Sequence, residues 1–253
     1  MRARELDGSI SKVPAVTLGF WIIKILATTL GETAGDTLSM TLNWGYLAST
    51  AVFATILILF VSLQIAARRL RPFLYWGTII ASTTAGTTMA DYATRSLGIG
   101  YFGGSVLLLC CVMASLAIWR RALGSIAVET VHEPRAEIYY WITITFSQTL
   151  GTALGDWTAD TGGLGYIGAA LIFTAVLGIL LGLYKWTLAD RVPLFWAAFI
   201  LTRPLGAAVG DFLDKPVATG GLDFSRPVAS AVLAVAIIFC IILFSRGAAI
   251  RDR

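Results

Sequence analysis

The sequence predicts an all-α integral membrane protein with eight transmembrane helices, built as four parallel two-helix repeats in two homologous halves. The first observation behind this prediction is the composition: of the 253 residues, 57% are hydrophobic and 13% are charged, and the mean hydropathy is +0.78. A soluble domain carries about 25% charged residues. The polar residues of this chain are therefore too few to cover a soluble core.

The second observation is an internal repeat that orders the whole chain. An aromatic pair ending in Trp starts the spacing W-x9-G-x4-D in four places, and the residue before each Asp is Gly or Ala. A fixed self-similar period of this kind governs the fold. The Asp residues lie 55, 65 and 55 positions apart, so the chain is two halves offset by 120. The repeated pairs are Trp21 and Asp36, Trp76 and Asp91, Trp141 and Asp156, and Trp196 and Asp211.

Each repeat is expected to hold a first helix that ends in the Gly and Asp signature, a short glycine-rich loop and a plainer return helix. Apolar spans of about 20 residues fit a hydrocarbon core of about 30 Å. Three return helices begin at a Gly-Tyr pair nine residues after the Asp, at Gly45, Gly100 and Gly165. The fourth repeat departs from this rule at Leu222-Asp223-Phe224. In chain order, we expect spans at 15–38, 44–67, 72–93, 100–120, 137–158, 164–186, 192–213 and 227–245.

The loop charges predict the orientation of these spans. The loops on the side of the Asp residues offer only Arg95, Lys215 and Arg226. By the positive-inside rule, both termini then lie on the cytoplasmic side of a bacterial inner membrane, and the repeats are parallel rather than inverted. The basic residues on the cytoplasmic side are Arg2, Arg4, Lys12, Arg68, Arg69, Arg71, Arg120, Arg121, Arg135, Lys185, Arg191, Arg246, Arg251 and Arg253.

These spans divide the chain into two halves joined by a linker. The linker holds the single His132. The predicted parts are a cytoplasmic N-terminal tail (1–13), a first half of two helix-hairpin repeats (14–123), a cytoplasmic linker (124–136), a second half of two helix-hairpin repeats (137–246) and a cytoplasmic tail (247–253).

The repeated carboxylates are the candidate metal-binding residues. They lie about 20 residues along their helices, about 30 Å from the cytoplasmic end and hence near the outer edge of the hydrocarbon. Crowded carboxylates repel one another unless a cation or proton relieves them, and their oxygens suit hard cations such as Mg²⁺, Ca²⁺ and Mn²⁺. The alternative is that each Asp only ends a span. The candidate ligands are Asp36, Asp91, Asp156, Asp211 and Glu32.

A polar stripe runs inward from the four Asp residues, one and two helical turns before each of them. Such a stripe is typical of a permeation route, and structural hydrogen bonding between helices is the alternative. Lys24 and Arg203 are cations inside spans, where charge is costly, so we expect each to pair with a carboxylate of another helix. A cation fixed there could stand in for a transported ion. The residues predicted to line the transport path are Lys24, Thr28, Thr83, Thr87, Gln148, Thr152, Arg203 and Asp160.

Small residues and Trp residues complete the signature. The Gly pairs are spaced as small-xxx-small motifs, which let membrane helices pack closely. The four repeated Trp residues are expected to form an aromatic belt at the membrane interface. The glycines assigned to helix packing are Gly31, Gly35, Gly86, Gly151, Gly155, Gly206 and Gly210.

The fourfold G-x-x-x-[GA]-D pattern over eight helices with short loops resembles a family of bacterial small polytopic membrane proteins that has no assigned function. The resemblance covers about residues 14–246. It implies the repeat architecture, and it suggests a metal-ion exporter.

The function expected from these features is secondary transport, in which a hard divalent cation such as Mn²⁺ is exported with protons or the membrane potential as the driving force. The chain carries no nucleotide-binding loop or catalytic motif, so neither an enzyme nor a bound cofactor is expected. The net charge of +4 lies in loops and favours the lipid bilayer over nucleic acid as a partner. A homo-oligomer is one option. Alternatives are an ion channel on the same axis, a carrier of small organic cations, and a non-transporting scaffold or sensor.

Overall fold

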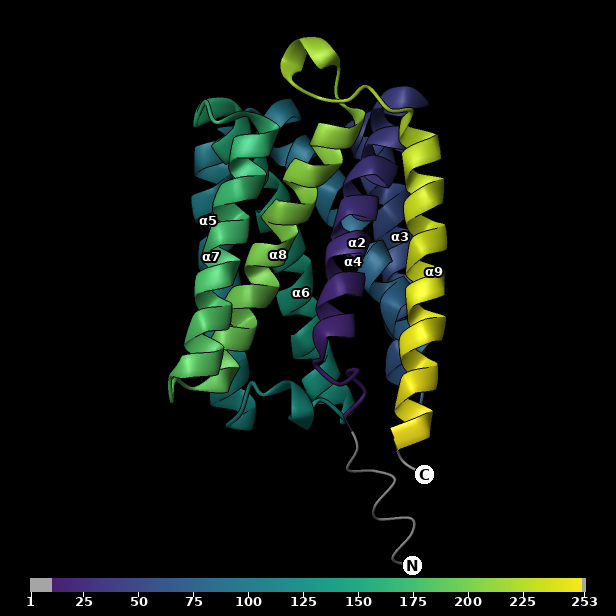
Figure 1. The fold of residues 1–253 in the computed structure, drawn as a ribbon, viewed down its shortest axis with the longest axis vertical. Coiled ribbons are helices and arrows are strands. Elements are labelled where there is room, and N and C mark those ends of the chain that lie inside the picture. The colour runs from purple at the N-terminus through teal and green to yellow at the C-terminus, as the bar shows by residue number, and fades with distance from the viewer. Residues whose placement is uncertain (1–10, 252–253) are drawn as a thin grey trace, which may run out of the picture.

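The computed structural model describes residues 11–251, which form eight long α-helices and no strand (Figure 1). Arg2, Arg4 and Arg253 of the predicted cytoplasmic set lie outside the described residues, as do the side chains of Arg246 and Arg251. The helices are α2 (Leu18–Asp36), α3 (Gly45–Ala66), α4 (Pro72–Asp91), α5 (Gly100–Leu123), α6 (Pro134–Asp156), α7 (Gly165–Trp186), α8 (Arg191–Asp214) and α9 (Arg226–Arg251).

Each expected span coincides with one of these helices, and local sequence signals explain several of their ends. Pro72 and Pro134 begin α4 and α6, where the missing N–H of proline costs nothing. The Asp190 carboxylate caps α8 by accepting a hydrogen bond from the Val192 N–H at 3.0 Å. The largest difference from the expected bounds is at α9, which continues to Arg251.

The repeated Asp residues of the first three repeats mark a change of helix type. Asp36, Asp91 and Asp156 are the last residues of α2, α4 and α6, and each is followed by one π-helical turn. These turns are η1 (Thr37–Thr41), η2 (Tyr92–Ser96) and η4 (Trp157–Thr161). In the fourth repeat α8 continues past Asp211 to Asp214, followed by the 3₁₀ turn η5 (Val217–Thr219). Single π turns are frequent at functional sites.

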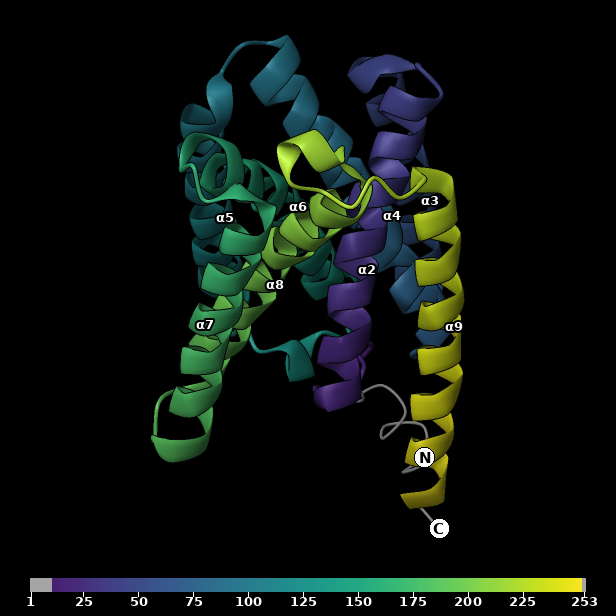
Figure 2. The same cartoon turned by 45° about the horizontal axis from the view of Figure 1, so that its top comes forward.

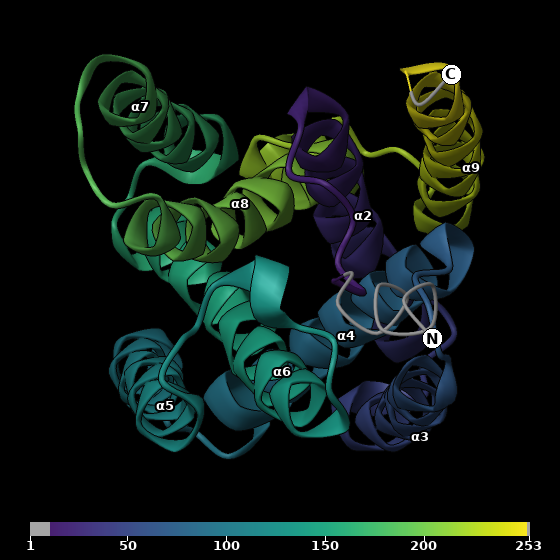
Figure 3. The ribbon, with the colours of Figure 1, turned by 90° about the horizontal axis from the view of Figure 1, so that it is seen from below.

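Four helices form an inner ring and four surround it (Figure 3). In the ring, α2 packs on α4, α4 on α6, α6 on α8, and α8 on α2. These helices run in the same direction, because their aromatic pairs meet at one end of the bundle and their Asp residues at the other. We call these the aromatic end and the Asp end. The first turn of α2 and the last turn of α9 both lie at the aromatic end (Figures 1 and 2).

The outer helices interlock the repeats. A short loop joins the two helices of each sequence repeat, but the return helix packs mainly on the inner helix of the following repeat (Figure 3). Thus α3 covers α4, α5 covers α6, and α7 covers α8. The last helix, α9, covers α2 and closes the circle.

Five of the described helices are long and apolar enough to cross a membrane: α3, α5, α7, α8 and the part of α9 up to Phe244. The remaining three, α2, α4 and α6, belong to the inner ring. Their polar side chains are buried within the bundle, Lys24 and Glu32 of α2 among them. The outer helices instead expose apolar side chains, such as Leu171 and Ile179 of α7. The bundle is therefore polar inside and apolar outside, a distribution that suits lipid as the surrounding solvent.

The repeated Trp residues do not form a surface belt, contrary to our expectation. Trp76, Trp141 and Trp196 are each only 3% exposed, because each indole packs on an aromatic ring of the neighbouring inner helix. The hydroxyls of Tyr75 and Tyr140 also meet, at 2.5 Å. The contacts that close this aromatic layer are Phe20–Trp76, Tyr75–Trp141, Tyr140–Trp196 and Phe195–Trp21, with ring centroids 5.2 to 6.1 Å apart.

The signature glycines lie where neighbouring inner helices touch. A Cβ on Gly206 would lie 2.9 Å from the backbone carbonyl carbon of Thr28, and a Cβ on Gly210 would lie 2.7 Å from the Cβ of Glu32. The same contact recurs around the ring, since the residue two turns before one Asp always faces a glycine of the adjacent helix. These facing pairs are Thr83 with Gly31, Gln148 with Gly86, Arg203 with Gly151, and Thr28 with Gly206, followed one turn later by Thr87 with Gly35, Ala207 with Gly155, and Glu32 with Gly210.

Gly206→Ala should destabilise the bundle, because its methyl group would press on the backbone of Thr28. Overpacking of this kind costs about 1–3 kcal/mol. Gly178→Ala in α7 is the matched control, since a Cβ there has no neighbouring atom within 4 Å. Thermal unfolding of both variants in detergent measures the difference. Equal unfolding temperatures for the two variants would contradict this packing.

Candidate functional site

The four repeated Asp side chains are buried at the Asp end of the inner ring, where each is 1–3% exposed. Asp36, Asp91 and Asp156 end their α-helices, and Asp211 lies one turn before the end of α8. They do not form one symmetrical ring of free carboxylates. Instead, basic side chains divide them into two bridged pairs.

Arg95 bridges one pair and Lys215 the other. The Arg95 Nε lies 2.9 Å from Asp91, and its Nη2 lies 3.1 Å from Asp156. The Lys215 Nζ lies 3.1 Å from Asp211 and also pairs with Asp36. Each base follows the Asp of its own repeat by four residues and reaches the Asp of the neighbouring repeat. In the predicted topology both bases count only as loop charges, although their i,i+4 spacing from a repeated Asp is a signal for this bridging role.

Both bridging bases remain positively charged at neutral pH. Burial lowers the pKa of Lys215, but the attraction of Asp211 and Asp36 outweighs burial and raises the pKa well above its ordinary value. The same balance, with Asp91 and Asp156 as the attracting groups, raises the pKa of Arg95. The protein thus supplies its own cations to its Asp residues.

A third acid and a second base enlarge the Lys215 pair. Asp214 lies 3.9 Å from the Lys215 Nζ. The Nε of Arg226, the first residue of α9, lies 3.3 Å from Asp214 and 3.9 Å from Asp36. The helix that closes the outer circle therefore also contributes a charge to the site.

One turn below the Asp level, all four inner helices meet in one buried hydrogen-bonded cluster. The Nη2 of Arg203 lies 2.9 Å from the Glu32 carboxylate, 2.6 Å from the Thr87 hydroxyl and 2.5 Å from the Thr152 hydroxyl. Both hydroxyls are also 3.4 Å from Glu32. We call these four residues the Arg203 cluster. It gives Arg203 the carboxylate partner expected of a cation inside a span, and it fills the axis of the ring.

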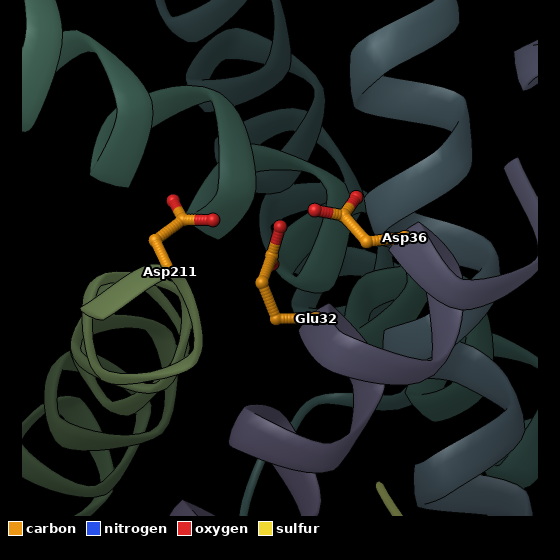
Figure 4. Close-up of side chains that lie close together, drawn as sticks. All are labelled: Glu32, Asp36 and Asp211. Carbon is orange, nitrogen blue, oxygen red and sulfur yellow. The ribbon is translucent and has the colours of Figure 1, made fainter. Parts of the chain in front are cut away.

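Three carboxylates from two adjacent helices are arranged as a cation site would require. One oxygen each of Glu32, Asp36 and Asp211 lie within 4.8 Å of one another, and all three residues are buried (Figure 4). Hard divalent cations lie about 2.0–2.6 Å from their oxygen ligands, so oxygens this far apart can share one ion. Asp91 and Asp156 are not part of this group.

Two of the predicted transport-path residues do not take the expected positions. Lys24 has no carboxylate partner among the described residues, because Glu32 is engaged by Arg203 and the residue facing Lys24 on α8 is Phe199. Its Nζ lies 4.2 Å from the centre of the Phe199 ring. Asp160 is exposed in η4 and makes no ion pair within the described part of the chain.

The residues of the stripe two turns below the Asp level are buried. Thr28 donates to backbone carbonyls of α2 and α8. The side chains of Thr83 and Gln148 have no hydrogen-bond partner in the described structure.

Comparison with protein families finds the same fourfold division of the chain. The family model for a repeat of unknown function (DUF347) matches residues 19–70, 74–124, 139–189 and 194–248. Each match covers most of one inner helix and the outer helix that follows it. This confirms the internal repeat that the W-x9-G-x4-D spacing predicted, and it carries no information on a metal. No curated protein and no solved structure matches the chain.

Arg203→Met should destabilise the bundle strongly, because it leaves the Glu32 carboxylate buried without its cation. Removal of one partner from a buried ion pair costs about 3–5 kcal/mol. Glu32→Gln in the same chain should restore part of that loss, since the uncompensated charge is then gone. A double-mutant cycle of unfolding in detergent measures the coupling between the two residues. Purely additive effects would show that the two side chains do not depend on each other.

Proposed function

The chain belongs to the DUF347 repeat family, and we propose that its four repeats form a secondary transporter for a hard divalent cation in a bacterial inner membrane. In this proposal all eight long helices cross the bilayer, as four parallel two-helix repeats with both termini in the cytoplasm. Mn²⁺ is the leading candidate cation and export the leading direction, with protons or the membrane potential as the driving force.

The membrane arrangement is supported by how the polar helices are covered. Three inner helices are less apolar than the other five. Of these, α2 is covered by α9, α4 by α3, and α6 by α5. A helix of about 20 residues is about 30 Å long, which matches the hydrocarbon thickness. The shortest helix, α2, has 19 residues. Every inner helix is thus long enough to span while its charges stay away from lipid.

The orientation is supported by the way the two ends of the bundle use their basic residues. At the Asp end, Arg95, Lys215 and Arg226 are engaged in ion pairs with buried carboxylates. The exposed basic residues in the loop between α3 and α4, such as Arg68 and Arg69, lie at the other end. The positive-inside rule counts free loop charges, so the aromatic end is assigned to the cytoplasm.

The observation that carries the cation proposal is the buried group of Glu32, Asp36 and Asp211. Around it, six carboxylates meet four basic side chains, which favours the uptake of positive charge. The six are Asp36, Asp91, Asp156, Asp211, Asp214 and Glu32, and the four are Arg95, Arg203, Lys215 and Arg226.

Lys215 is the group with which an incoming cation must compete. Its ammonium bridges Asp36 and Asp211, two of the three candidate ligands. We infer that Lys215 holds the two helices together when no ion is bound and swings toward the loop when one binds. A mobile base that alternates with the substrate is a means of coupling binding to movement.

A carrier is favoured over a channel because the axis is filled at two further levels. The Arg203 cluster fills it just below the Asp residues, and the aromatic layer fills it at the other end. Passage of a cation therefore requires the inner helices to rearrange. Such a rearrangement is the alternating access of a carrier rather than conduction through an open pore.

The topology is testable with reporters on the intact chain. A reporter fused after Arg253 should behave as cytoplasmic, and one inserted between Gly162 and Gly163 as external. Activity of a periplasm-specific reporter at the C-terminus would contradict the parallel arrangement of repeats.

Asp36→Asn or Asp211→Asn should abolish transport, because Asn keeps the size of Asp without the negative charge that a hard cation requires. We expect divalent-cation flux into proteoliposomes, measured with Mn²⁺, to fall by at least about tenfold, given that even outer partners of metal ligands typically contribute 10–100-fold. The matched control is Asp223→Asn. Asp223 is an exposed loop residue with φ of 57°, a conformation that Asn also tolerates.

Two results would count against this proposal. Unchanged Mn²⁺ flux in both ligand variants would remove the carboxylates from the mechanism. Absence of flux in the wild type for Mn²⁺, Mg²⁺ and Ca²⁺ alike would favour a non-transporting role for the bundle.

A further inference from the structure

The layer beneath the Arg203 cluster contains several buried hydrogen-bond donors that have no acceptor. They are contributed by all four inner helices, and their residues are completely buried. None has a hydrogen-bond partner among the described residues. The donor atoms are Lys24 Nζ, Thr83 Oγ1, Gln148 Nε2, and the Nε and Nη1 of Arg203.

Packing contacts place these donors at adjacent heights along the axis. Lys24 of α2 lies over Phe199, which precedes Arg203 by one turn on the same face of α8. The stem of Arg203 lies against Gly151 of α6, and Gln148 precedes Gly151 by one turn on that helix. Gln148 in turn lies against Gly86 of α4, one turn beyond Thr83. Two adjacent turns of the inner ring thus hold the whole set.

The charge of this layer is unbalanced. Glu32 neutralises Arg203 through Nη2, but Glu32 lies two turns away from Lys24, about 12 Å along α2. On the other side of Lys24, Glu137 of α6 lies about 10 Å further toward the aromatic end, and its carboxylate is already paired with Lys12 at 2.5 Å. The Phe199 ring attracts the ammonium without neutralising it. Water would satisfy the hydrogen bonds, whereas an anion would also balance the charge of a protonated Lys24.

The engaged face of Arg203 indicates the size of that anion. A guanidinium binds an oxyanion through two parallel N–H groups, and Nη2 belongs to both edges that can do this. Here Nη2 is already occupied by Glu32, Thr87 and Thr152. The remaining Nε and Nη1 share no edge of the guanidinium, so only one of them can contact a given ion, and a single N–H suits a single-atom acceptor. At the level of Lys24, the buried side chains of Ile79 and Ile144 also limit the space inside the ring.

We propose that this layer binds one chloride-sized monovalent anion, with Lys24 and Arg203 as the charged partners and Gln148 and Thr83 as neutral donors. The anion neutralises Lys24 and completes the inner half of the ring. This site lies below the carboxylates of the proposed cation site and is separated from them by the Arg203 cluster. It does not depend on cation transport.

The test uses the purified full-length protein in detergent, with no divalent metal added. Thermal unfolding is followed while sodium gluconate is replaced by sodium chloride at constant ionic strength and pH. We expect a saturable rise in the unfolding temperature of wild type, of about 5 °C or more at chloride well above its Kd. Lys24→Met should lose this response. Lys185→Met, which removes an exposed lysine of α7, should keep it.

A second variant and a second probe keep the test decisive if Lys24→Met does not fold. Gln148→Leu should shift the midpoint of the chloride response to higher concentration while leaving the ion pair of Arg203 intact. Crystals grown in sodium bromide should show one anomalous peak between Lys24 and Arg203. A wild-type protein indifferent to chloride, an undiminished response in Gln148→Leu, or bromide only at the surface would overturn the site. A response to acetate without one to chloride would overturn the assigned anion.

Discussion

The close approach of four parallel helices along their glycine faces is the constraint on which the rest of the structure depends. Helices in lipid gain little from burying apolar surface and associate through packing and hydrogen bonds instead. With hydrogen as the side chain at Gly31, Gly86, Gly151 and Gly206, each helix can seat a polar side chain of its neighbour. The same closeness lets Arg203 reach groups on three other helices. The contacts that pack the inner helices therefore also bring their polar side chains together.

That arrangement makes the interior a set of mutually dependent charges. Buried ion pairs add little to stability compared with apolar packing, but loss of one member is costly. Arg95 and Lys215 each hold two acids from different helices, so neither acid can be considered alone. In the proposed transporter, an external cation that enters this site would exchange with Lys215. Occupancy of the site would then be coupled to the spacing of α2 and α8, the two helices that Lys215 bridges.

Much of the fold follows from the sequence, whereas less of the site does. Hydropathy and the Asp period located the helices, and the glycine spacing identified the faces that touch. The positions of Arg95 and Lys215 were visible, but their bridging role depends on which helix lies next to which, and this is a tertiary property. The Trp residues were misplaced for a similar reason: an aromatic residue near a helix end suits an interface equally well, and only the neighbouring aromatic ring buries it. Lys24 was expected to pair with a carboxylate, yet its ammonium lies over the ring of Phe199 on α8.

The interlocked order of the outer helices has a consequence for biosynthesis. The ribosome makes α2 first, with Lys24, Glu32 and Asp36 on it, whereas its cover, α9, is made last. In the proposed membrane arrangement, the three charges of α2 thus have to be kept from lipid until the last helix has been inserted. The same order means that two copies of a half-length ancestor could have closed an identical circle, each lending its last helix to the other. Fusion of the halves would then have replaced an encounter between two chains with a connection inside one.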